Sequence, residues 1–591
     1  MSGSNGKPTR LPWLTRSAYS VGHVLNDLTA AVWFSYLIVY FQKVREMSAS
    51  HAGILLFVGQ GVDAAMTPTV GVLSDKFTSL PYGQRKSWHL FGTLCVALSF
   101  PFILGSDFPF VKHFSTNGQL GYFSVFIAIF QIGWASTQVA HLSLIPELTS
   151  SSRERDFLNS ARYAFTIVAS VAVFGLAFGL LQASAGRDVG PSDLWHFALL
   201  SYLVVATGLV AATYFHVGVA EPSHEEKQKA CGKSESCKRV TWSDWFKRAL
   251  FYQIGGVYMC ARLVVNISQV YLPLFLLDTL QMDKTNIAVA PLTVFIAGLL
   301  TTSLQKVVNN AIGRRMTLLL GILVVLGTCV GAHFIDKSSP YLVYGVVIGL
   351  GVGGTTMLVT ALAMEADLIG DDVEGSAFVY GALSFLDKLS NGIAVLVIQF
   401  MAQAHTKATP DGDNATSKAA SADEIDEELG PFYRTIMVYV PGAAALWCLA
   451  FMISTYFGGG YHEYSKREAM KEAKSRAYKP LLDGGADGRD SPSDRYADAD
   501  SPRAIQKYGA INPALDAQYD AQYGGAGYNS MPASYMRGSA GLPGNASPEP
   551  SHIFLSHKTP ADDAIMRTWD SSMGEPRINA GIDTPSAFGI N

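Results

Sequence analysis

The residues WHFALLSYLVVATGLVAATYFHVG, at positions 195–218, contain no Asp, Glu, Lys or Arg in 24 consecutive positions. The hydrocarbon core of a bilayer is about 30 Å thick, so a helix needs roughly 20 mostly apolar residues to cross it. This stretch therefore predicts a membrane-spanning helix. The chain continues into a charged, polar segment, residues 219–249, and then into another long apolar stretch that begins at residue 250. We therefore expect the chain to cross a membrane on both sides of this polar segment.

Working outward from this centre, the same length criterion predicts six spans before the polar segment and six after it. The expected spans are residues 17–43, 51–74, 87–106, 121–146, 160–183, 195–218, 250–279, 287–308, 316–335, 341–368, 375–402 and 432–457. The predicted fold class is an all-α polytopic membrane protein with twelve transmembrane helices. Its predicted parts are an N-terminal tail (1–16), an N-terminal six-helix bundle (17–218), a linker (219–249), a C-terminal six-helix bundle (250–457) and a tail (458–591).

The composition fits a membrane protein with a polar tail. Hydrophobic residues make up 49% of the chain and charged residues 16%, and the mean hydropathy is +0.21. Residues 458–591 lack the aliphatic side chains that would offset chain entropy, so we expect a disordered tail. The net charge of −4 gives no indication of nucleic-acid binding. Because no nucleophile elbow, phosphate loop or metal-spaced His/Cys cluster is present, we predict neither an enzyme, nor a metal site, nor a cofactor.

The positive charges predict the orientation in the membrane. The segments on the side of the two tails hold 24 Lys and Arg residues when the C-terminal tail is counted only as far as Lys479, whereas the loops on the other side hold 9. Positively charged loops remain in the cytosol, so both termini are predicted to be cytosolic. Asn414-Ala-Thr416 is a glycosylation sequon in the loop before the last span. This topology places Asn414 outside the cytosol, where glycosylation occurs.

The two halves of the chain resemble one unit used twice. Tyr19-x3-His23 in the first span is echoed by Tyr258-x3-Arg262 in the seventh. Six spans in each copy give both copies the same membrane orientation, so an axis along the membrane normal should relate them. Transporters built from such repeats bind their substrate between the halves, near the bilayer midplane.

Polar side chains gather in the first, second, fourth, seventh and eleventh spans. An ionisable side chain costs roughly 2.5–3.5 kcal/mol at the centre of a membrane helix, so its presence needs a reason. A polar cavity between the halves would account for this distribution. The residues expected to bind a small polar substrate are His23, Asn26, Asp27, Gln138, Arg262, Asn266 and Lys388. The residues expected at a coupling-ion site are Asp63 and Thr67.

The alternative role for such residues is to fasten helices together by polar pairing. The side chains for which fastening and function are equally favoured are Gln60, Gln131, His141 and Gln269. The ionisable side chains for which function is favoured are Asp27, Asp63, Arg262 and Lys388, since less costly residues could fasten helices. Asp387 and Lys388 lie about 100° apart around a helix. They therefore cannot both face one cavity, and we predict that Lys388 does.

The loop after the second span reads Gly71-Val-Leu-Ser-Asp75-Lys76 and, further on, Gly83-Gln-Arg85-Lys86. These strings resemble the loop motif of the major facilitator superfamily, and their spacing is similar to its glycoside–pentoside–hexuronide:cation symporter branch. The resemblance runs through residues 17–457 and implies the major facilitator fold. It also implies a gate at the cytosolic ends of the helices. The gate residues that it implies are Asp75, Lys76, Arg85, Glu147 and Arg162.

Longer strings resemble one subgroup of this branch. They include Gln131-Ile-Gly-Trp134-Ala-Ser-Thr-Gln138 and Ala377-Phe-Val-Tyr380-Gly-Ala-Leu-Ser-Phe-Leu-Asp387-Lys388. The resemblance implies a multi-pass protein of the lysosomal or melanosomal membrane that is needed for cysteine import into those organelles. The plasma membrane is the alternative location. For cysteine, Arg262 or Lys388 would hold the carboxylate and Asp27 the ammonium group.

The chain departs from the melibiose-type permeases of the branch at two acidic positions. Asp63 matches the first acid of their cation site, but Thr67 stands at the second, and Gln138 replaces an acid in the fourth span. A sodium site requires several charged oxygens. Proton coupling through Asp63 is therefore favoured over sodium coupling, and a sugar becomes the second choice of substrate.

Two rival functions stay open. One is a cation-coupled symporter of a sugar or glycoside, and the other is a membrane scaffold or receptor that transports nothing and acts through its tail. Tyr478-Lys-Pro-Leu481 fits a tyrosine sorting pattern in that tail, although patterns this short often arise by chance. The expected partners are thus a small-molecule substrate, the lipid bilayer and, through Tyr478 to Leu481, sorting adaptors.

Overall fold

The computed structural model describes residues 11–76, 82–105, 111, 113–149, 151–221, 242–369, 373–408 and 422–457. All regular secondary structure in these ranges is helical. Twelve helical stretches within them are long and apolar enough to cross a membrane, which confirms the predicted number of spans and the all-α fold class. The predicted glycosylation site Asn414, the sorting sequence Tyr478 to Leu481 and the tail 458–591 lie outside the described residues.

Each predicted span corresponds to one helix or to two or three consecutive helical segments. The first six spans contain α1 (Trp13–Val21), α2 (Val24–Val39), η1 (Tyr40–Val44), α3 (Ala49–Lys76), α4 (Gln84–Leu104), α6 (Thr116–Leu148), α7 (Ser152–Ala183) and α8 (Leu194–Gly218). The second six contain α10 (Ala249–Leu274), η4 (Phe275–Thr279), α11 (Asn286–Ile312), α12 (Arg314–Phe334), α13 (Val343–Ile369), α14 (Val373–Ala408) and α15 (Ala422–Phe457).

The first span is broken, where the sequence predicts one continuous helix. A turn at Gly22 and His23 separates α1 from α2. Nε2 of His141 lies 2.9 Å from the carbonyl oxygen of Tyr19, and Nε2 of His89 lies 3.0 Å from that of Gly22. Imidazole groups from neighbouring helices thus contact the carbonyl oxygens that flank the break. Side chains therefore provide hydrogen-bond partners for the buried carbonyl groups at the break.

Both halves carry the same deviation at the end of their first span. The five-residue π-helix η1 begins at Tyr40, and the five-residue π-helix η4 begins at Phe275, 235 positions later. The sixth residue after each of these starts has a positive φ, 52° at Glu46 and 51° at Gln281. The internal repeat seen in the sequence therefore extends to the details of the backbone.

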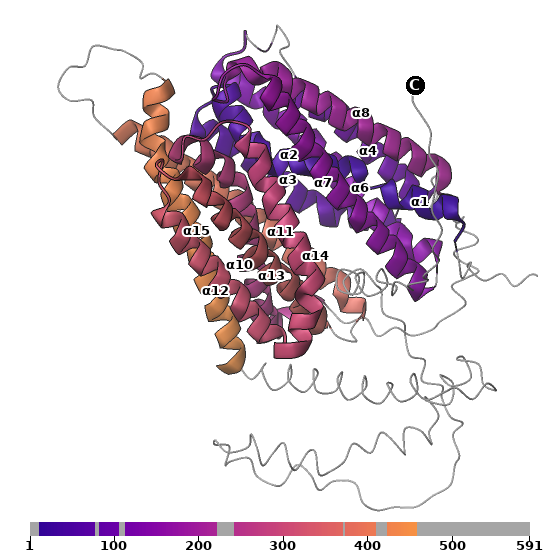
Figure 1. The fold of residues 1–591 in the computed structure, drawn as a ribbon. Helices are drawn as coiled ribbons and strands as arrows, with labels where there is room; N and C mark the ends of the chain where they lie inside the picture. Colours follow the sequence, from indigo (N-terminus) through magenta and orange to yellow (C-terminus); the bar gives the residue numbers. More distant parts are fainter. Residues whose placement is uncertain are drawn as a thin grey trace, which may run out of the picture. The chain divides into compact units, whose positions relative to one another are not determined.

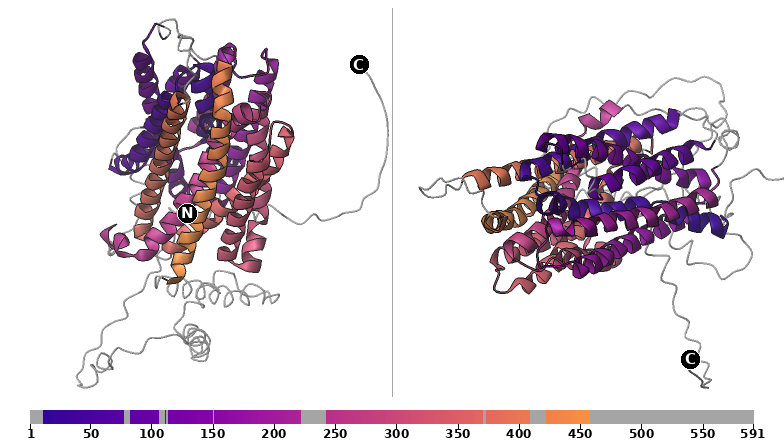
Figure 2. Two further views of the ribbon diagram at one scale, coloured as in Figure 1. Left: turned by 90° about the vertical axis from the view of Figure 1, so that its left-hand side faces the viewer. Right: turned by 90° about the horizontal axis from the view of Figure 1, so that it is seen from above.

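Three helix pairs pack across the boundary between the halves: α2 with its equivalent α10, α3 with α14, and α7 with α11. The last two pairs correspond to each other in the repeat, since α3 is equivalent to α11 and α7 to α14. We call the end of the bundle at which α1 begins and α15 ends the terminal face, and the other end the opposite face. Figure 1 shows the helices of the two halves converging toward the opposite face and separating toward the terminal face. The views in Figure 2 show long helices that run roughly along one direction. A site between the halves is therefore expected along these three helix pairs.

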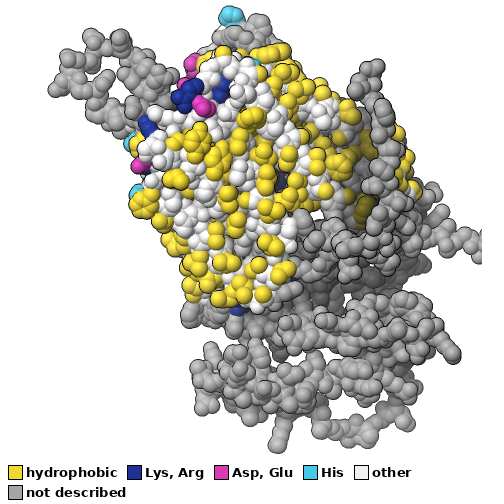
Figure 3. Space-filling view, in the orientation of Figure 1, with side chains coloured by type: hydrophobic (Ala, Val, Ile, Leu, Met, Phe, Trp, Pro, Cys, Tyr) yellow, Lys and Arg dark blue, Asp and Glu magenta, His cyan; other side chains and the backbone are white. Residues whose placement is uncertain are grey.

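The outer surface of the helices is apolar. Large hydrophobic side chains such as Val217, Trp195 and Trp447 are between 64% and 80% exposed. Figure 3 shows hydrophobic side chains spread over the visible face, with charged side chains gathered near one end. An exposed apolar surface of this extent marks contact with lipid rather than with water.

Candidate functional site

Lys388 of α14 links the two halves in the middle of their helices. Its Nζ lies 2.7 Å from Oδ1 of Asp63 and 2.7 Å from Oγ1 of Thr67, both on α3. The Thr67 hydroxyl in turn donates to Asp63 Oδ1 at 3.0 Å. The lysine and aspartate side chains are 13% and 9% exposed. The structure thus brings together three residues that the sequence assigned separately to the substrate site and the coupling-ion site.

Arg262 of α10 forms the second ion pair at this depth. Its Nε donates to Oδ2 of Asp387 at 2.8 Å, and Asn391 donates to the other carboxylate oxygen at 2.7 Å. Asp387 therefore turns toward α10, while its neighbour Lys388 turns toward α3. This divergence agrees with the angle expected between adjacent residues of a helix. From the sequence we predict a cavity-facing role for Lys388 and none for Asp387, yet Asp387 holds Arg262 in place.

Asp27 of α2 lies within the first half. One carboxylate oxygen lies 2.9 Å from Nδ1 of His23, and the other accepts from the Thr166 hydroxyl of α7 at 3.0 Å. Asn26, the adjacent residue, donates to the backbone oxygen of Trp134 on α6 at 3.1 Å. His23 and Asp27 are thus together as predicted, whereas Asn26 fastens α2 to α6. Thr166 was not predicted, because its short polar side chain gives no signal in a span.

A small cavity separates the two mid-depth ion pairs from the opposite face. Gln60 of α3, Asn266 of α10 and Asn391 of α14 contribute its polar lining, and its volume is about 20 Å³. A water molecule needs roughly 10–15 Å³ by this measure, so the cavity has room for one water but not for a metabolite. Gln138, the remaining predicted substrate residue, is half-buried on α6.

The predicted gate residues lie at the terminal ends of the helices of the first half. Arg85 of α4 contacts Glu147 of α6, Nε to Oε1, at 3.0 Å. Lys76 is exposed at the end of α3, and Arg162 is half-buried on α7. The side chain of Asp75 lies outside the described residues. The structure therefore brings Arg85 and Glu147 together as a pair.

At the opposite face, polar links join the two halves. Nζ of Lys43 in η1 lies 2.8 Å from Oδ1 of Asp278 in η4. Gln42 donates to Gln399 of α14 at 2.6 Å. Nζ of Lys284 lies 3.0 Å from Oδ1 of Asp193, which precedes α8, and both side chains are at most 2% exposed. In the sequence, Lys43 and Lys284 are two of the 9 positive charges in the loops on the side away from the tails.

A further signal in the sequence could have identified the Lys43–Asp278 pair. Asp278 lies at the end of the predicted seventh span, and the internal repeat aligns it with Lys43. Residues of opposite charge at equivalent positions can meet where the symmetry axis passes between the repeats.

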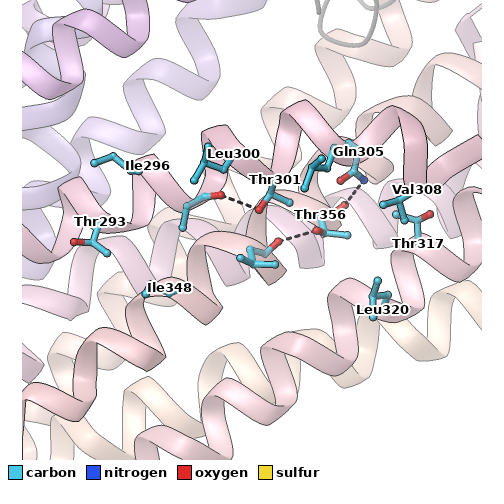
Figure 4. Close-up of a pocket in the computed structure, with 13 residues that line it drawn as sticks. Thr293, Ile296, Leu300, Thr301, Gln305, Val308, Thr317, Leu320, Ile348 and Thr356 are labelled. Carbon is cyan, nitrogen blue, oxygen red and sulfur yellow. Dashed lines mark hydrogen bonds between the residues drawn. The ribbon is translucent and has the colours of Figure 1, made fainter.

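An apolar groove of about 500 Å³ lies in the second half, away from the ion pairs. Figure 4 shows its lining from α11, α12 and α13, including Leu300, Leu320 and Ile348. These three side chains are 47–62% exposed. Gln305 points to Thr360 and donates to its hydroxyl at 2.8 Å. The groove has the character of a lipid-facing surface rather than of a polar substrate site.

Two six-span repeats with buried ion pairs where they meet define a membrane transporter of the major facilitator class. The family described as "MFS/sugar transport protein" matches residues 18–456. The chain belongs to this family.

Relatives narrow the class. Major facilitator superfamily domain-containing protein 12 of Equus caballus is 42% identical over 416 residues, which cover 67% of this chain and 87% of the relative. The Homo sapiens protein of the same name is 41% identical over 418 residues, with the same coverage. The crystal structure of the nucleoside transporter NupG has a TM-score of 0.54 at 10% identity and covers 75% of this chain and 99% of that one. This last likeness shows the shared fold.

Proposed function

We propose that this transporter imports cysteine into lysosomes or lysosome-related organelles by alternating access, with a proton as the coupling ion. The proposal rests on the resemblance to the subgroup described above and on one observation at the site. That observation is the contact of Lys388 with Asp63 and Thr67, which joins the two halves in the middle of the bundle. A charged link at this position must change when the halves move relative to each other.

The charges near this link suit a zwitterionic amino acid. Arg262 contacts Asp387 through Nε, and its side chain is 30% exposed. The two terminal nitrogens of the guanidinium can then receive a carboxylate in the bidentate geometry that arginine favours. Asp27 supplies the opposite charge for the ammonium group. We assign the carboxylate of cysteine to Arg262 and its ammonium group to Asp27.

The coupling proton competes with the Lys388 ammonium for Asp63. In the structure, the ammonium lies between Asp63 and Thr67, where a coupling cation would bind. Protonation of Asp63 cancels its negative charge and removes the main attraction for Lys388. The link then opens, because a buried ammonium without a counter-ion is costly and Lys388 must move to another partner. Proton binding thereby becomes linked to the movement of the halves.

The orientation follows from the charge of the loops. Positively charged loops are cytosolic, so the terminal face lies in the cytosol and the opposite face in the lumen. The links of Lys43 with Asp278 and of Lys284 with Asp193 join the halves at the lumenal side. This conformation is therefore the one that loads substrate from the cytosol, as import requires.

Uptake by the purified protein in liposomes tests the proposal. Labelled cysteine is offered with pH gradients of either direction, and exchange of internal for external cysteine is measured in parallel. We expect Asp63→Asn to retain exchange but to lose the dependence of accumulation on the gradient. Asp336→Asn makes the same chemical change at an exposed ion pair and should behave like the wild type. Gradient-dependent accumulation by Asp63→Asn would refute the coupling role.

The variant Arg262→Gln tests the substrate assignment. It keeps a polar side chain but removes the charge, so we expect a higher KM for cysteine. An unchanged KM would show that the carboxylate binds elsewhere.

A sugar or glycoside is the second candidate substrate, because the family is described as containing sugar transport proteins. A panel of labelled sugars in the same liposomes distinguishes the candidates. Sugar flux without cysteine flux would replace the proposed substrate and leave the transporter class unchanged.

A further inference from the structure

Four histidines from different segments form a row inside the first half of the bundle. They are His23 in the turn before α2, His141 on α6, His89 on α4 and His216 on α8. The ring centroids of successive members lie 5.7, 6.0 and 4.9 Å apart. His141 and His89 are fully buried and His23 is 6% exposed. Four titratable rings in one buried row are more than helix packing requires.

The row connects a candidate substrate residue with the terminal face. At the inner end, Nδ1 of His23 lies 2.9 Å from the Asp27 carboxylate. At the outer end, Nδ1 of His216 lies 3.1 Å from the hydroxyl of Tyr82, which is 45% exposed just before α4. The row therefore reaches from the interior of the half to solvent.

The hydrogen-bond partners assign the tautomers of the neutral rings. A carbonyl oxygen only accepts, so His141 and His89 carry their hydrogen on Nε2, which contacts such oxygens. Nδ1 of His89 is then an acceptor, and His216 must donate to it from Nε2, 3.0 Å away. The Tyr82 hydroxyl donates to the remaining nitrogen of His216. His89 and His216 therefore each donate one hydrogen bond from one ring nitrogen and accept one at the other.

The inner part of the row contains two ring nitrogens that accept no hydrogen bond. His23 donates from Nδ1 to Asp27, so its Nε2 is a lone pair, and the same reasoning leaves a lone pair on Nδ1 of His141. Both atoms are buried, and neither has a hydrogen-bond partner among the described residues. A buried acceptor without a partner is costly. One additional proton would use such a lone pair, and the Asp27 carboxylate beside His23 would balance its charge.

The charged neighbours favour His23 as the place where that proton stays. Arg162 of α7 interacts electrostatically with His141. Lys86 of α4 donates to the backbone oxygen of His216 at 3.0 Å, and it also interacts electrostatically with His89. Tyr19 of α1 stacks on the His141 ring at 4.3 Å and brings no charge. The cations oppose positive charge in the middle and at the outer end of the row, whereas Asp27 attracts it at the inner end.

We propose that His23 and Asp27 form a proton-binding pair that exchanges its proton with the terminal face through His141, His89 and His216. A proton that binds Nδ1 of His216 allows the hydrogen on Nε2 to pass to Nδ1 of His89. Transfer from His89 to His141 and then to His23 crosses two longer gaps, each of which needs a ring rotation or a bridging water. Only N–H and O–H bonds form or break, and one proton moves in total.

This proton site is separate from Asp63, and it does not depend on cysteine being the substrate. Its test therefore needs no substrate. Exchange of the imidazole C2 hydrogen for deuterium, followed by mass spectrometry of peptides, reports a titration midpoint for each histidine. Exchange of the ring N–H hydrogens with solvent, followed by NMR of protein labelled with ¹⁵N-histidine, reports how fast protons reach each ring. Both measurements use the full chain in detergent micelles across the pH range in which imidazole titrates.

Two variants separate the pair from the path. Asp27→Asn should move the midpoint of His23 to lower pH by about 1 unit or more, since an adjacent opposite charge is lost. His216→Gln should leave that midpoint unchanged but slow the exchange of the His23 ring N–H hydrogen with solvent severalfold, because the outer relay is interrupted. His216 is half-buried, so this variant is expected to fold. His405→Gln, at an exposed position near the opposite face, is the matched control and should change neither quantity.

The outcomes decide the proposal independently of the transport assay. The proton-binding pair is overturned if His23 shows no titration, or if its titration midpoint is the same in Asp27→Asn as in the wild type. An unchanged exchange rate of the His23 ring N–H hydrogen in His216→Gln overturns the path. Failure of cysteine uptake would instead contradict the substrate proposed above and leave these exchange results standing.

Discussion

Lys43 and Asp278 occupy equivalent positions in the two internal repeats, and they contact each other, Nζ to Oδ1, at 2.8 Å. Each is the fourth residue of its π-helix. Two equivalent residues can meet only where the axis that relates the repeats passes between them. The pair therefore marks this axis at the opposite face and closes the boundary between the halves there.

The equivalence of these positions predicts the result of a charge exchange. Lys43→Met should destabilise the protein by about 3–5 kcal/mol, because it removes one partner of a buried ion pair. The double variant Lys43→Asp with Asp278→Lys should recover most of this loss. The two positions are equivalent in the repeats, so the exchanged aspartate and lysine can form the same ion pair. Thermal unfolding of the purified proteins in detergent measures both effects. A double variant no more stable than Lys43→Met would show that the two positions are not interchangeable.

The contact between Lys388 and Asp63 predicts a strong coupling between the two substitutions. In a double-mutant cycle with Asp63→Asn and Lys388→Gln, we expect a coupling free energy of about 0.5–3 kcal/mol. The second substitution should cost less after the first, because no buried charge remains without its partner. The exposed pair of Arg434 and Asp336 is the control and should give about 0–1 kcal/mol. Equal couplings in the two cycles would argue against a desolvated link at mid-depth.

The break in the first span predicts a position-specific effect of adding one methyl group. A Cβ at Gly22 would lie 2.5 Å from the Phe215 ring and 2.7 Å from that of His141. Gly22→Ala should therefore destabilise the protein by about 1–3 kcal/mol, as overpacking in a tight core does.

Gly61→Ala in α3 is the matched control for that substitution. No atom lies within 4 Å of a Cβ at Gly61, and alanine favours a helix more than glycine does. We expect no loss of thermal stability for this variant. Similar melting temperatures for the two alanine variants would show that the turn at Gly22 is not tightly packed.

Removal of the C-terminal segment distinguishes a transporter from a scaffold. The residues that form the described site all lie before residue 458, so a chain truncated after residue 457 should retain substrate flux in liposomes. A scaffold that acts through its tail would lose its function on truncation and would tolerate Asp63→Asn. Loss of flux in the truncated chain, with normal amounts of folded protein, would contradict our assignment of the site.

Much of the fold could be predicted because hydrophobic length is a local property. Each span is decided by about 20 neighbouring residues, and bilayer thickness sets that number. The broken first span could not be predicted in this way, since the carbonyl oxygens beside Gly22 contact His89 and His141, which come from other spans. The role of Asp387 could not be predicted for the same reason, because its partner Arg262 lies on another helix.

The sequence by itself determined that the chain crosses a membrane twelve times, that its two halves are repeats, and that charged residues lie inside the spans. Only the tertiary structure decided which charges meet. Lys388 contacts Asp63, 325 positions earlier in the chain, and helical spacing says nothing about partners on another helix. Hydrophobic patterns act along the chain, whereas ion pairs depend on distances in space, which only the packing of the two halves sets.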